Sequence, residues 1–260
     1  MYLFGPVPSR RLGLSLGVDL LNCKSCNLNC VYCELGRTFK YEDKRRVFVK
    51  TADVLKELNE YFGSGGAADF VTFSGAGEPT LAENLGEAIA AAKRETGRKA
   101  ALITNAVLFS DAQVRKEAAL ADVVLPSVDA ASEETFKKLN RPHASISLEN
   151  YLDGLRKFSA EYRGGLWVEV MLVKGMNDNE TELEKLAAYL GSLDNVEKIQ
   201  VNTVVRARAE ETADPVDEQT MARAVKILGP KAEAIGSFSG GKIQTINNVR
   251  DAAFSIIKLR

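Results

Sequence analysis

All four cysteines of this 260-residue chain lie between positions 23 and 33, as Cys23, Cys26, Cys30 and Cys33. Cysteines that only pack a core scatter through a sequence as other small apolar residues do, so this clustering indicates a set of ligands. Thiolates bind zinc and the iron atoms of iron–sulfur clusters. The cysteine loop, residues 22–36, is therefore the first candidate for chemistry.

Three kinds of site are compatible with this spacing. Four thiols suffice for a tetrahedral zinc site, although zinc knuckles usually join two ligand pairs across a longer spacer. A ferredoxin-like carrier would also use all four cysteines, one for each iron. The third site uses only Cys26, Cys30 and Cys33 and leaves one iron of a 4Fe–4S cluster open to a small molecule, with Cys23 as a bystander. The spacing alone leaves all three open.

The composition excludes few classes of protein. Hydrophobic residues make up 45% of the chain and charged residues 27%, and the formal net charge is −1, so there is no strong nucleic-acid signal. We see no signal peptide and no apolar stretch of about 20 residues, and we expect no membrane contact. A thiol cluster without export signals indicates a metal site in a reducing, cytoplasmic environment.

Strand and helix patterns alternate along the chain, with connections of a few residues. The predicted strands cover residues 14–21, 69–74, 99–104, 122–128, 166–173 and 196–204, and the predicted helices cover 51–62, 80–95, 111–120, 132–140, 147–162, 180–191 and 216–228. This alternation predicts an α/β fold with a parallel sheet of about six strands, open or curled into a partial barrel. The cysteine loop follows the first of these strands. Residues 40–46 are interpreted as a solvated surface loop.

Polar residues stand where the predicted strands end, the edge at which such sheets bind ligands. The second strand leads into Gly75-Ala76-Gly77-Glu78, where glycines let the backbone approach a ligand and a carboxylate can take an ammonium group. Later strand ends carry further polar candidates, namely Asn105, Ser127, Asp129, Asn202 and Arg206. Taken singly, each is explained equally well by a turn, a cap or a satisfied core side chain.

The triplet Cys26-x3-Cys30-x2-Cys33, with Tyr32 before its last cysteine, resembles the signature of the radical S-adenosylmethionine (SAM) superfamily. The Gly77-Glu78 turn resembles its Gly-Gly-Glu motif, although Ala76 stands where the first glycine of that motif would be. The resemblance spans about residues 5–210. Within the superfamily, segments 5–13, 30–36 and 140–142 look like a small family related to wyosine synthase, the tRNA-modifying enzyme.

The resemblance implies a partial (β/α)6 barrel in a single domain over residues 1–260, with residues 211–260 as an extension that packs on the core or forms a lid. It implies a 4Fe–4S cluster on Cys26, Cys30 and Cys33, and SAM that is cleaved reductively to a 5′-deoxyadenosyl radical. The implied SAM contacts are Tyr32 beside the adenine, Gly75, Ala76, Gly77 and Glu78 at the amino group, Asn105, Ser127 and Asp129 at the ribose and carboxylate, and Asn202 at the adenine.

The substrate stays open among a small molecule, an RNA and a peptide. Arg10, Arg11 and Arg206 suggest an anionic substrate, although surface arginines are as good an interpretation. Wyosine synthase carries a second cluster, for which this chain has no cysteine beyond Cys23, so we expect a different reaction. A reductant such as flavodoxin or ferredoxin would supply the electron. The alternatives are an iron–sulfur electron-transfer or assembly protein that uses all four cysteines, and a zinc-stabilised RNA-binding module.

Overall fold

The computed structural model describes residues 1–9 and 11–235. The strands of this part form one sheet in chain order, from β1 to β8. Their bounds are Leu3–Ser9 (β1), Gly13–Val18 (β2), Phe70–Phe73 (β3), Lys99–Thr104 (β4), Val123–Pro126 (β5), Gly165–Leu172 (β6), Val196–Thr203 (β7) and Ala232–Ala234 (β8). Only the β1–β2 pair is antiparallel, and every other neighbouring pair is parallel. The open, mostly parallel sheet is consistent with the predicted partial barrel.

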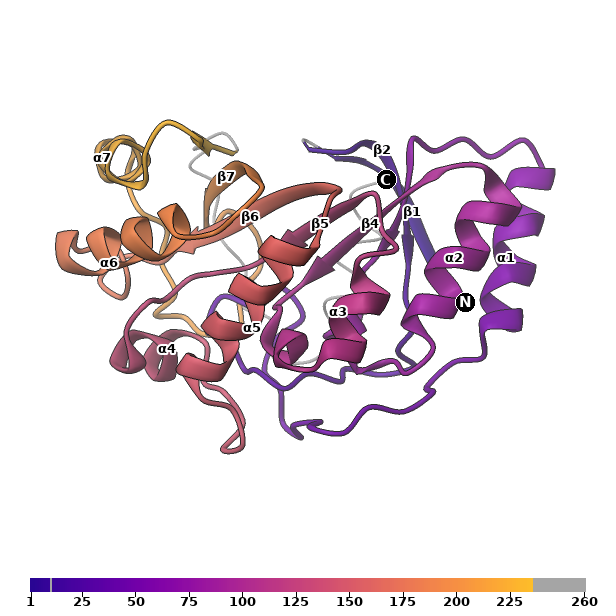
Figure 1. The fold of residues 1–260 in the computed structure, drawn as a ribbon, viewed down its shortest axis with the longest axis horizontal. Helices are drawn as coiled ribbons and strands as arrows, with labels where there is room; N and C mark the ends of the chain where they lie inside the picture. Colours follow the sequence, from indigo (N-terminus) through magenta and orange to yellow (C-terminus); the bar gives the residue numbers. More distant parts are fainter. Residues whose placement is uncertain (10, 236–260) are drawn as a thin grey trace.

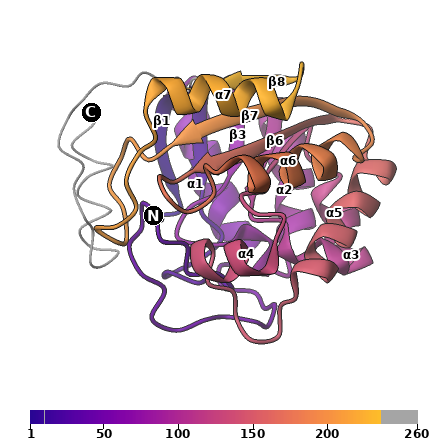
Figure 2. The ribbon, with the colours of Figure 1, turned by 90° about the vertical axis from the view of Figure 1, so that its left-hand side faces the viewer.

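Helices return the chain between the parallel strands and cover one face of the sheet (Figure 1). They are α1 (Thr51–Gly63), α2 (Leu85–Thr96), α3 (Ala112–Ala118), α4 (Glu133–Leu139), α5 (Leu148–Glu161), α6 (Glu180–Gly191) and α7 (Glu218–Leu228), with short 3-10 helices at Pro79–Leu81 (η1) and Val107–Ser110 (η2). Seen from the side, α7 and α4 lie at opposite ends of the layer (Figure 2). None of the helices in this part of the chain is long and apolar enough to cross a membrane.

Side-chain alternation along the strands separates two faces of the sheet. In β6, Leu166, Val168 and Val170 are buried in the core beneath the helices. Trp167 and Glu169 alternate with them and therefore lie on the inner face. This face is where a barrel keeps its ligand site, and it carries the polar side chains of β6 and β7.

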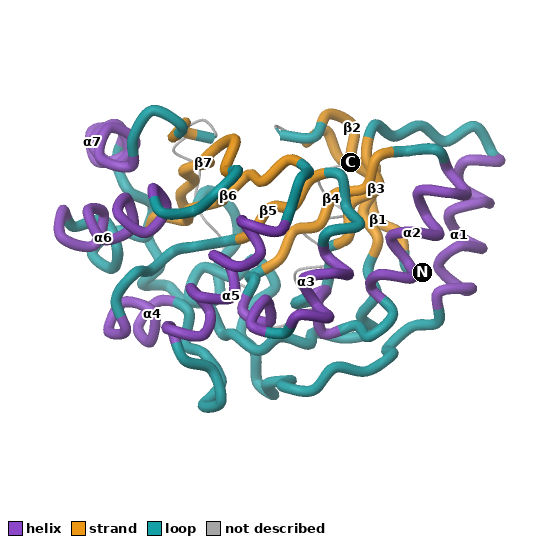
Figure 3. The backbone as a smooth tube through the Cα atoms, viewed as in Figure 1, coloured by secondary structure: helices purple, strands orange, loops and turns teal. Residues whose placement is uncertain are grey.

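Two strands lie outside the predicted set. The antiparallel strand β1 contains Pro6 and Pro8, which cannot donate to a sheet and are tolerated because β1 is an edge strand. The short β8 pairs with β7 at the other edge. The cysteine loop therefore follows the second strand of the chain, not the first, in the long connection from β2 to α1 (Figure 3).

One helix in particular starts differently from the prediction. The helix predicted over 80–95 begins as η1 and continues as α2. Thr51 is the first residue of α1, and its hydroxyl accepts a hydrogen bond from Nδ2 of Asn84 at 2.9 Å. The cap of α6 is Asn179, whose side chain accepts from the amide of Glu182.

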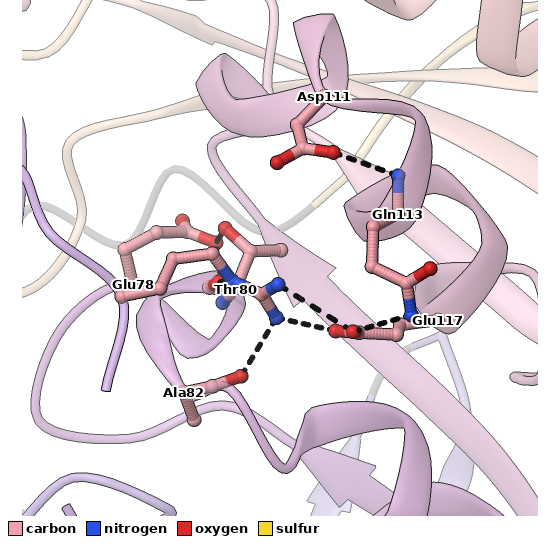
Figure 4. Close-up of polar contacts among 7 residues, drawn as sticks. Glu78, Thr80, Ala82, Asp111, Gln113 and Glu117 are labelled. Atoms are coloured by element: carbon pink, nitrogen blue, oxygen red, sulfur yellow. Dashed lines mark hydrogen bonds and ion pairs between the residues drawn. The ribbon is translucent and has the colours of Figure 1, made fainter. Parts of the chain in front are cut away.

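The interpretation of residues 40–46 as a solvated loop is wrong for Arg45. Its guanidinium donates to the carbonyls of Thr80 (2.8 Å) and Ala82 (3.0 Å) and forms an ion pair with Glu117 (Figure 4). The side chain of Arg45 is only 17% exposed. Arg45 therefore holds the turn that follows β3 against helix α3. The predicted elements after residue 235 lie outside the described residues.

Candidate functional site

The cysteine loop lies at the carboxyl end of β2 and is shaped by two tight turns. The amide of Cys33 donates to the carbonyl of Cys30, and the amide of Gly36 donates to the carbonyl of Cys33, both at 3.1 Å. The thiols of Cys26, Cys30 and Cys33 are half-buried, whereas Cys23 is exposed. The loop therefore presents three sheltered thiols and one that faces solvent.

Two of the sheltered thiols, those of Cys26 and Cys30, have raised pKa values. Burial raises the pKa of Cys26 above its usual range, and Cys30, Glu78 and Cys33 raise it further. Burial also raises the pKa of Cys30 to about 12, and Asp129 adds to this effect. Thiols that resist ionisation for these reasons become thiolates when a cation binds them. The donor set thus fits a positively charged iron centre.

A single metal ion fits the loop less well. Within residues 1–9 and 11–235, no three Cys, His, Asp or Glu side chains converge as the ligands of one ion. A zinc site gathers four ligands around one ion, whereas a 4Fe–4S cluster takes each cysteine on a separate iron.

Each sheltered thiol also faces one side-chain nitrogen donor. Nδ2 of Asn105 lies 3.8 Å from Sγ of Cys26. Nδ2 of Asn140 lies 3.4 Å from Sγ of Cys30, and Nζ of Lys24 lies 3.5 Å from Sγ of Cys33. Sequence motifs alone did not single out Asn140 or Lys24 as site residues.

The glycine turn after β3 packs against the cysteine loop. The amide of Glu78 donates to the carbonyl of Ser25 at 2.9 Å. A Cβ on Gly77 would lie 1.8 Å from this carbonyl oxygen, and a Cβ on Gly75 would lie 2.5 Å from the carboxyl carbon of Asp19. Glycine is needed at both positions because the turn touches other parts of the protein, a reason that the sequence did not reveal.

Glu78 is 2% exposed and ties the turn to the end of β4. Its Oε1 accepts from the amide (3.0 Å) and hydroxyl (2.6 Å) of Thr80 and from the hydroxyl of Thr104 (2.6 Å). Among the residues that the structure describes, its Oε2 accepts from the amide of Asn105 alone, at 2.7 Å. Burial raises the pKa of Glu78, and these hydrogen bonds oppose the rise. Since a carboxylate oxygen has two lone pairs, Oε2 keeps one for a ligand.

Asn105 and Ala106 form the turn that ends β4. Nδ2 of Asn105 donates to Oδ1 of Asn27 at 2.7 Å, and its own Oδ1 accepts from the amide of Val107 at 3.1 Å. Ala106 adopts φ 58°, in the left-handed region that favours glycine. A glycine would adopt this conformation with less strain than Ala106 does.

Asp129 accepts a hydrogen bond from Tyr32, and the sequence predicted these two residues as separate cofactor contacts. Tyr32 and Asn140 donate to its Oδ2, the latter at 2.9 Å, and the amide of Met171 donates to its Oδ1 at 2.8 Å. Burial raises the pKa of Asp129 to about 6, against the effect of these hydrogen bonds. The carboxyl group therefore fixes the position of the Tyr32 ring. Ser127, the other candidate on this strand end, donates its amide to the carbonyl of Thr104 at 2.9 Å.

A hollow opens on the inner face beside β6 and β7. Within it, Arg11 forms an ion pair with Glu169, and their side chains are 19% and 12% exposed. Nη1 of Arg206 lies 3.2 Å from Oε2 of Glu34, and both of these side chains are about half exposed. Asn202 also lines the hollow. Both described arginines with a predicted substrate role are thus already paired, and Arg10 lies outside the described residues.

Two further side chains hold the site and were not predicted to do so. Asn177 is fully buried and donates to the carbonyls of Asp129 (2.9 Å) and Met171 (2.8 Å). Glu210 accepts from Arg37 at 2.7 Å and from Arg141 at 2.6 Å, and so links the cysteine loop to the segment after α4. His143 lies in the connection between α4 and α5, where Nδ1 of its ring lies 2.8 Å from the hydroxyl of Ser145.

Comparison with known proteins identifies the family. The family model described as the Radical SAM superfamily matches residues 23–187, from the first cysteine to α6. The chain belongs to the radical SAM superfamily. UPF0026 protein slr1464 of Synechocystis sp. is 40% identical over 207 residues, which cover 79% of this chain and 76% of that protein. This radical SAM protein is thus also a member of the UPF0026 family.

Two other comparisons set the limits of the likeness. A Brachyspira hyodysenteriae protein named GTPase Obg is 33% identical over 224 residues, which cover 86% of this chain but only 33% of that protein. The solved structure of TYW1 with a lysine–pyruvate adduct bound has a TM-score of 0.64 at 17% identity and covers 82% of this chain and 72% of that chain. At this identity the match shows a shared fold.

Membership of the superfamily confirms the predicted class of enzyme. The chain is a radical SAM enzyme that uses a 4Fe–4S cluster and SAM, and it requires a reductant. The fold shared with TYW1 agrees with the predicted partial barrel. The alternative of a four-cysteine electron-transfer protein finds no support.

Proposed function

We propose that Cys26, Cys30 and Cys33 hold the 4Fe–4S cluster and that Cys23 does not. The observation that carries this proposal is the sheltered group of three thiols, set apart from an exposed fourth. Three ligands leave one iron for SAM, whereas a fourth protein ligand would fill that position. The cluster supplies the electron that cleaves SAM to methionine and a 5′-deoxyadenosyl radical, which abstracts a substrate hydrogen.

The residues around the triplet suit the parts of SAM that each would meet. Glu78 would take the ammonium group of SAM on Oε2, its less occupied oxygen. The backbone of Gly75, Ala76 and Gly77 would lie alongside the methionyl part. Tyr32, held by Asp129, would face the adenine. The polar strand ends would bind the ribose, the carboxylate and the adenine edge, through Asn105, Ser127, Asp129 and Asn202.

The hollow beside β6 and β7 is the proposed substrate site. Arg11 and Arg206 would bind an anionic group, small or part of an RNA or a cofactor-like molecule. Such a group must displace Glu169 or Glu34 from its arginine, which makes recognition selective because a weakly charged ligand could not compete. A lysine–pyruvate adduct belongs to the related TYW1, and this chain lacks cysteines for the second cluster expected of wyosine synthase. We propose a different substrate.

Anaerobic reconstitution of single-cysteine variants tests the ligand set. We expect Cys23→Ala to keep its iron and to form 5′-deoxyadenosine from SAM with dithionite. Cys26→Ala, Cys30→Ala and Cys33→Ala should each lose both. A cluster that Cys23→Ala destroys, together with no SAM cleavage by the unsubstituted protein, would favour the electron-transfer alternative instead.

A further inference from the structure

The nitrogen donors that face the three sheltered thiols come from three separate segments. Lys24 belongs to the cysteine loop, Asn105 follows β4, and Asn140 follows α4. Cys23 differs, because its Sγ faces the hydroxyl of Ser25 at 3.5 Å. The chain thus directs one N–H group to each proposed ligand and none of these three to the fourth cysteine.

Other hydrogen bonds hold these donors in place. Asn140 is 4% exposed, and its Nδ2 also donates to Asp129. Nδ2 of Asn105 also donates to Asn27, and the ammonium of Lys24 also donates to the carbonyl of Gly36. The donors are therefore pre-organised, and they meet the sulfur atoms without a further loss of side-chain entropy.

Charge around the triplet is balanced between donors and two buried acids. Glu78 acts electrostatically on Cys26, and Asp129 acts on Cys30. One-electron reduction makes a cluster more negative, so nearby carboxylates oppose it and N–H donors favour it. Among the described side chains, Lys24 is the one cationic group with a hydrogen bond to a triplet sulfur.

We propose that Lys24 raises the reduction potential of the cluster, with Asn105 and Asn140 as neutral contributors. The ammonium offsets part of the negative field of Glu78 and Asp129 and so makes one-electron reduction by a weak reductant easier. This inference rests on the proposed ligation by Cys26, Cys30 and Cys33. Lys24 is a positioning and tuning residue, not a ligand.

A redox titration of reconstituted protein without SAM, followed by the EPR signal of the reduced cluster, tests the role of Lys24. At the midpoint potential of the unsubstituted protein, we expect Lys24→Met to show a tenfold lower ratio of reduced to oxidised cluster, equal to about 59 mV for a one-electron couple. Lys24→Arg should stay near the original midpoint. Lys40→Met is the matched control, because Lys40 is exposed and contacts no sulfur.

Equal midpoints for Lys24→Met and the unsubstituted protein would overturn the inference, as would an equal shift in Lys40→Met. Lys24→Gln, which keeps an N–H donor without the charge, gives the measurement if Lys24→Met loses iron. Loss of iron from both variants, with Lys24→Arg intact, would assign Lys24 to cluster retention and reject tuning. If the proposed ligands of the cluster are wrong, Cys23→Ala will lose iron, which is a separate result.

Discussion

Asp19 is a half-buried carboxylate directly after β2 that anchors the glycine turn. Its Oδ2 accepts from the amide of Ala76 at 3.0 Å, and its Oδ1 accepts from the amide of Leu21 at 2.8 Å. Burial raises the pKa of Asp19 to about 6, although both hydrogen bonds act in the opposite direction. The Asp19 carboxylate therefore holds the turn in place, but its partial burial makes the charged form less stable than it would be in water.

We expect Asp19 to make the free energy of unfolding fall as the pH rises from about 4 through 6. In this interval the folded protein keeps a proton that the unfolded chain has lost, so ionisation destabilises the folded state, by at most about 3 kcal/mol. Urea unfolding of Asp19→Asn and the unsubstituted protein at pH 4.5 and 7.5 gives the difference that isolates this group. The disadvantage of Asp19→Asn should shrink at the higher pH, and a constant difference would contradict the assignment.

Glu78→Gln should weaken SAM binding by about tenfold to a hundredfold. A glutamine has one acceptor oxygen, so its amide nitrogen would face either the donors at Oε1 or the amide of Asn105, and the charge that attracts an ammonium is lost. A hydrogen bond to a charged group contributes about 1.5–3 kcal/mol, which gives this range. Equilibrium dialysis with SAM measures it. Glu83→Gln, in an exposed position nearby, is the control and should bind normally. Equal affinities would remove Glu78 from the SAM site.

The sequence predicted the parallel core because strand and helix periods alternate clearly from Thr51 onward. All six predicted strands exist, as β2 to β7. It missed β1 because prolines lower strand propensity, and an edge strand has no periodicity of two buried faces. It missed β8 because three residues carry too little pattern. It did not separate η1 from α2, because the pattern over 80–95 is helical throughout.

The sequence predicted those parts of the site that consist of residues close together in the chain. The cysteine triplet and the Gly77-Glu78 turn are contiguous motifs, and the structure places them in contact. Asn140 and Lys24 were not singled out because their role depends on distance in space, across 110 residues in the case of Asn140 and Cys30. Single polar residues in loops give no sequence signal that distinguishes a sulfur contact from a solvated side chain.

Arg45 connects two elements, the turn that follows β3 and the helix α3. Its partner Glu117 lies in α3, with 11% of its side chain exposed, and also accepts from Nε2 of Gln113 at 3.0 Å (Figure 4). Removing the guanidinium leaves this carboxylate with one neutral donor. The turn would also lose two donors to the carbonyls of Thr80 and Ala82.

We therefore expect Arg45→Met to lower the free energy of unfolding by about 3 kcal/mol, the cost of breaking a mostly buried ion pair. Urea unfolding measures the change. Arg46→Met is the control, because the ion pair between Arg46 and Glu42 is more exposed on the arginine side, and it should change stability by less than about 1 kcal/mol. Similar effects of the two substitutions would show that Arg45 does not stabilise the contact between this turn and α3.

The hairpin between β1 and β2 connects the antiparallel edge with the interior of the whole sheet. Leu12 is 3% exposed and packs with Ala101, Val123 and Leu125 on the face opposite the helices. Arg11, beside it, reaches β6 and pairs with Glu169. Residues near the start of the chain thus cover part of the inner face of the sheet. The ion pair between Arg11 and Glu169 also lines the proposed substrate site.

A double-mutant cycle on Arg11 and Glu169 tests this closure. Arg11→Met and Glu169→Met should each lower the free energy of unfolding by about 3 kcal/mol, because each leaves a poorly solvated charge, whereas the double variant should be nearly as stable as the unsubstituted protein. The coupling energy should therefore exceed about 2 kcal/mol. The exposed pair Lys137–Glu133 provides the control cycle, for which we expect about 0.5 kcal/mol. If the losses at Arg11 and Glu169 are additive, the coupling energy is zero. The ion pair then does not stabilise the contact between the hairpin and the sheet, since a stabilising pair must give a coupling energy.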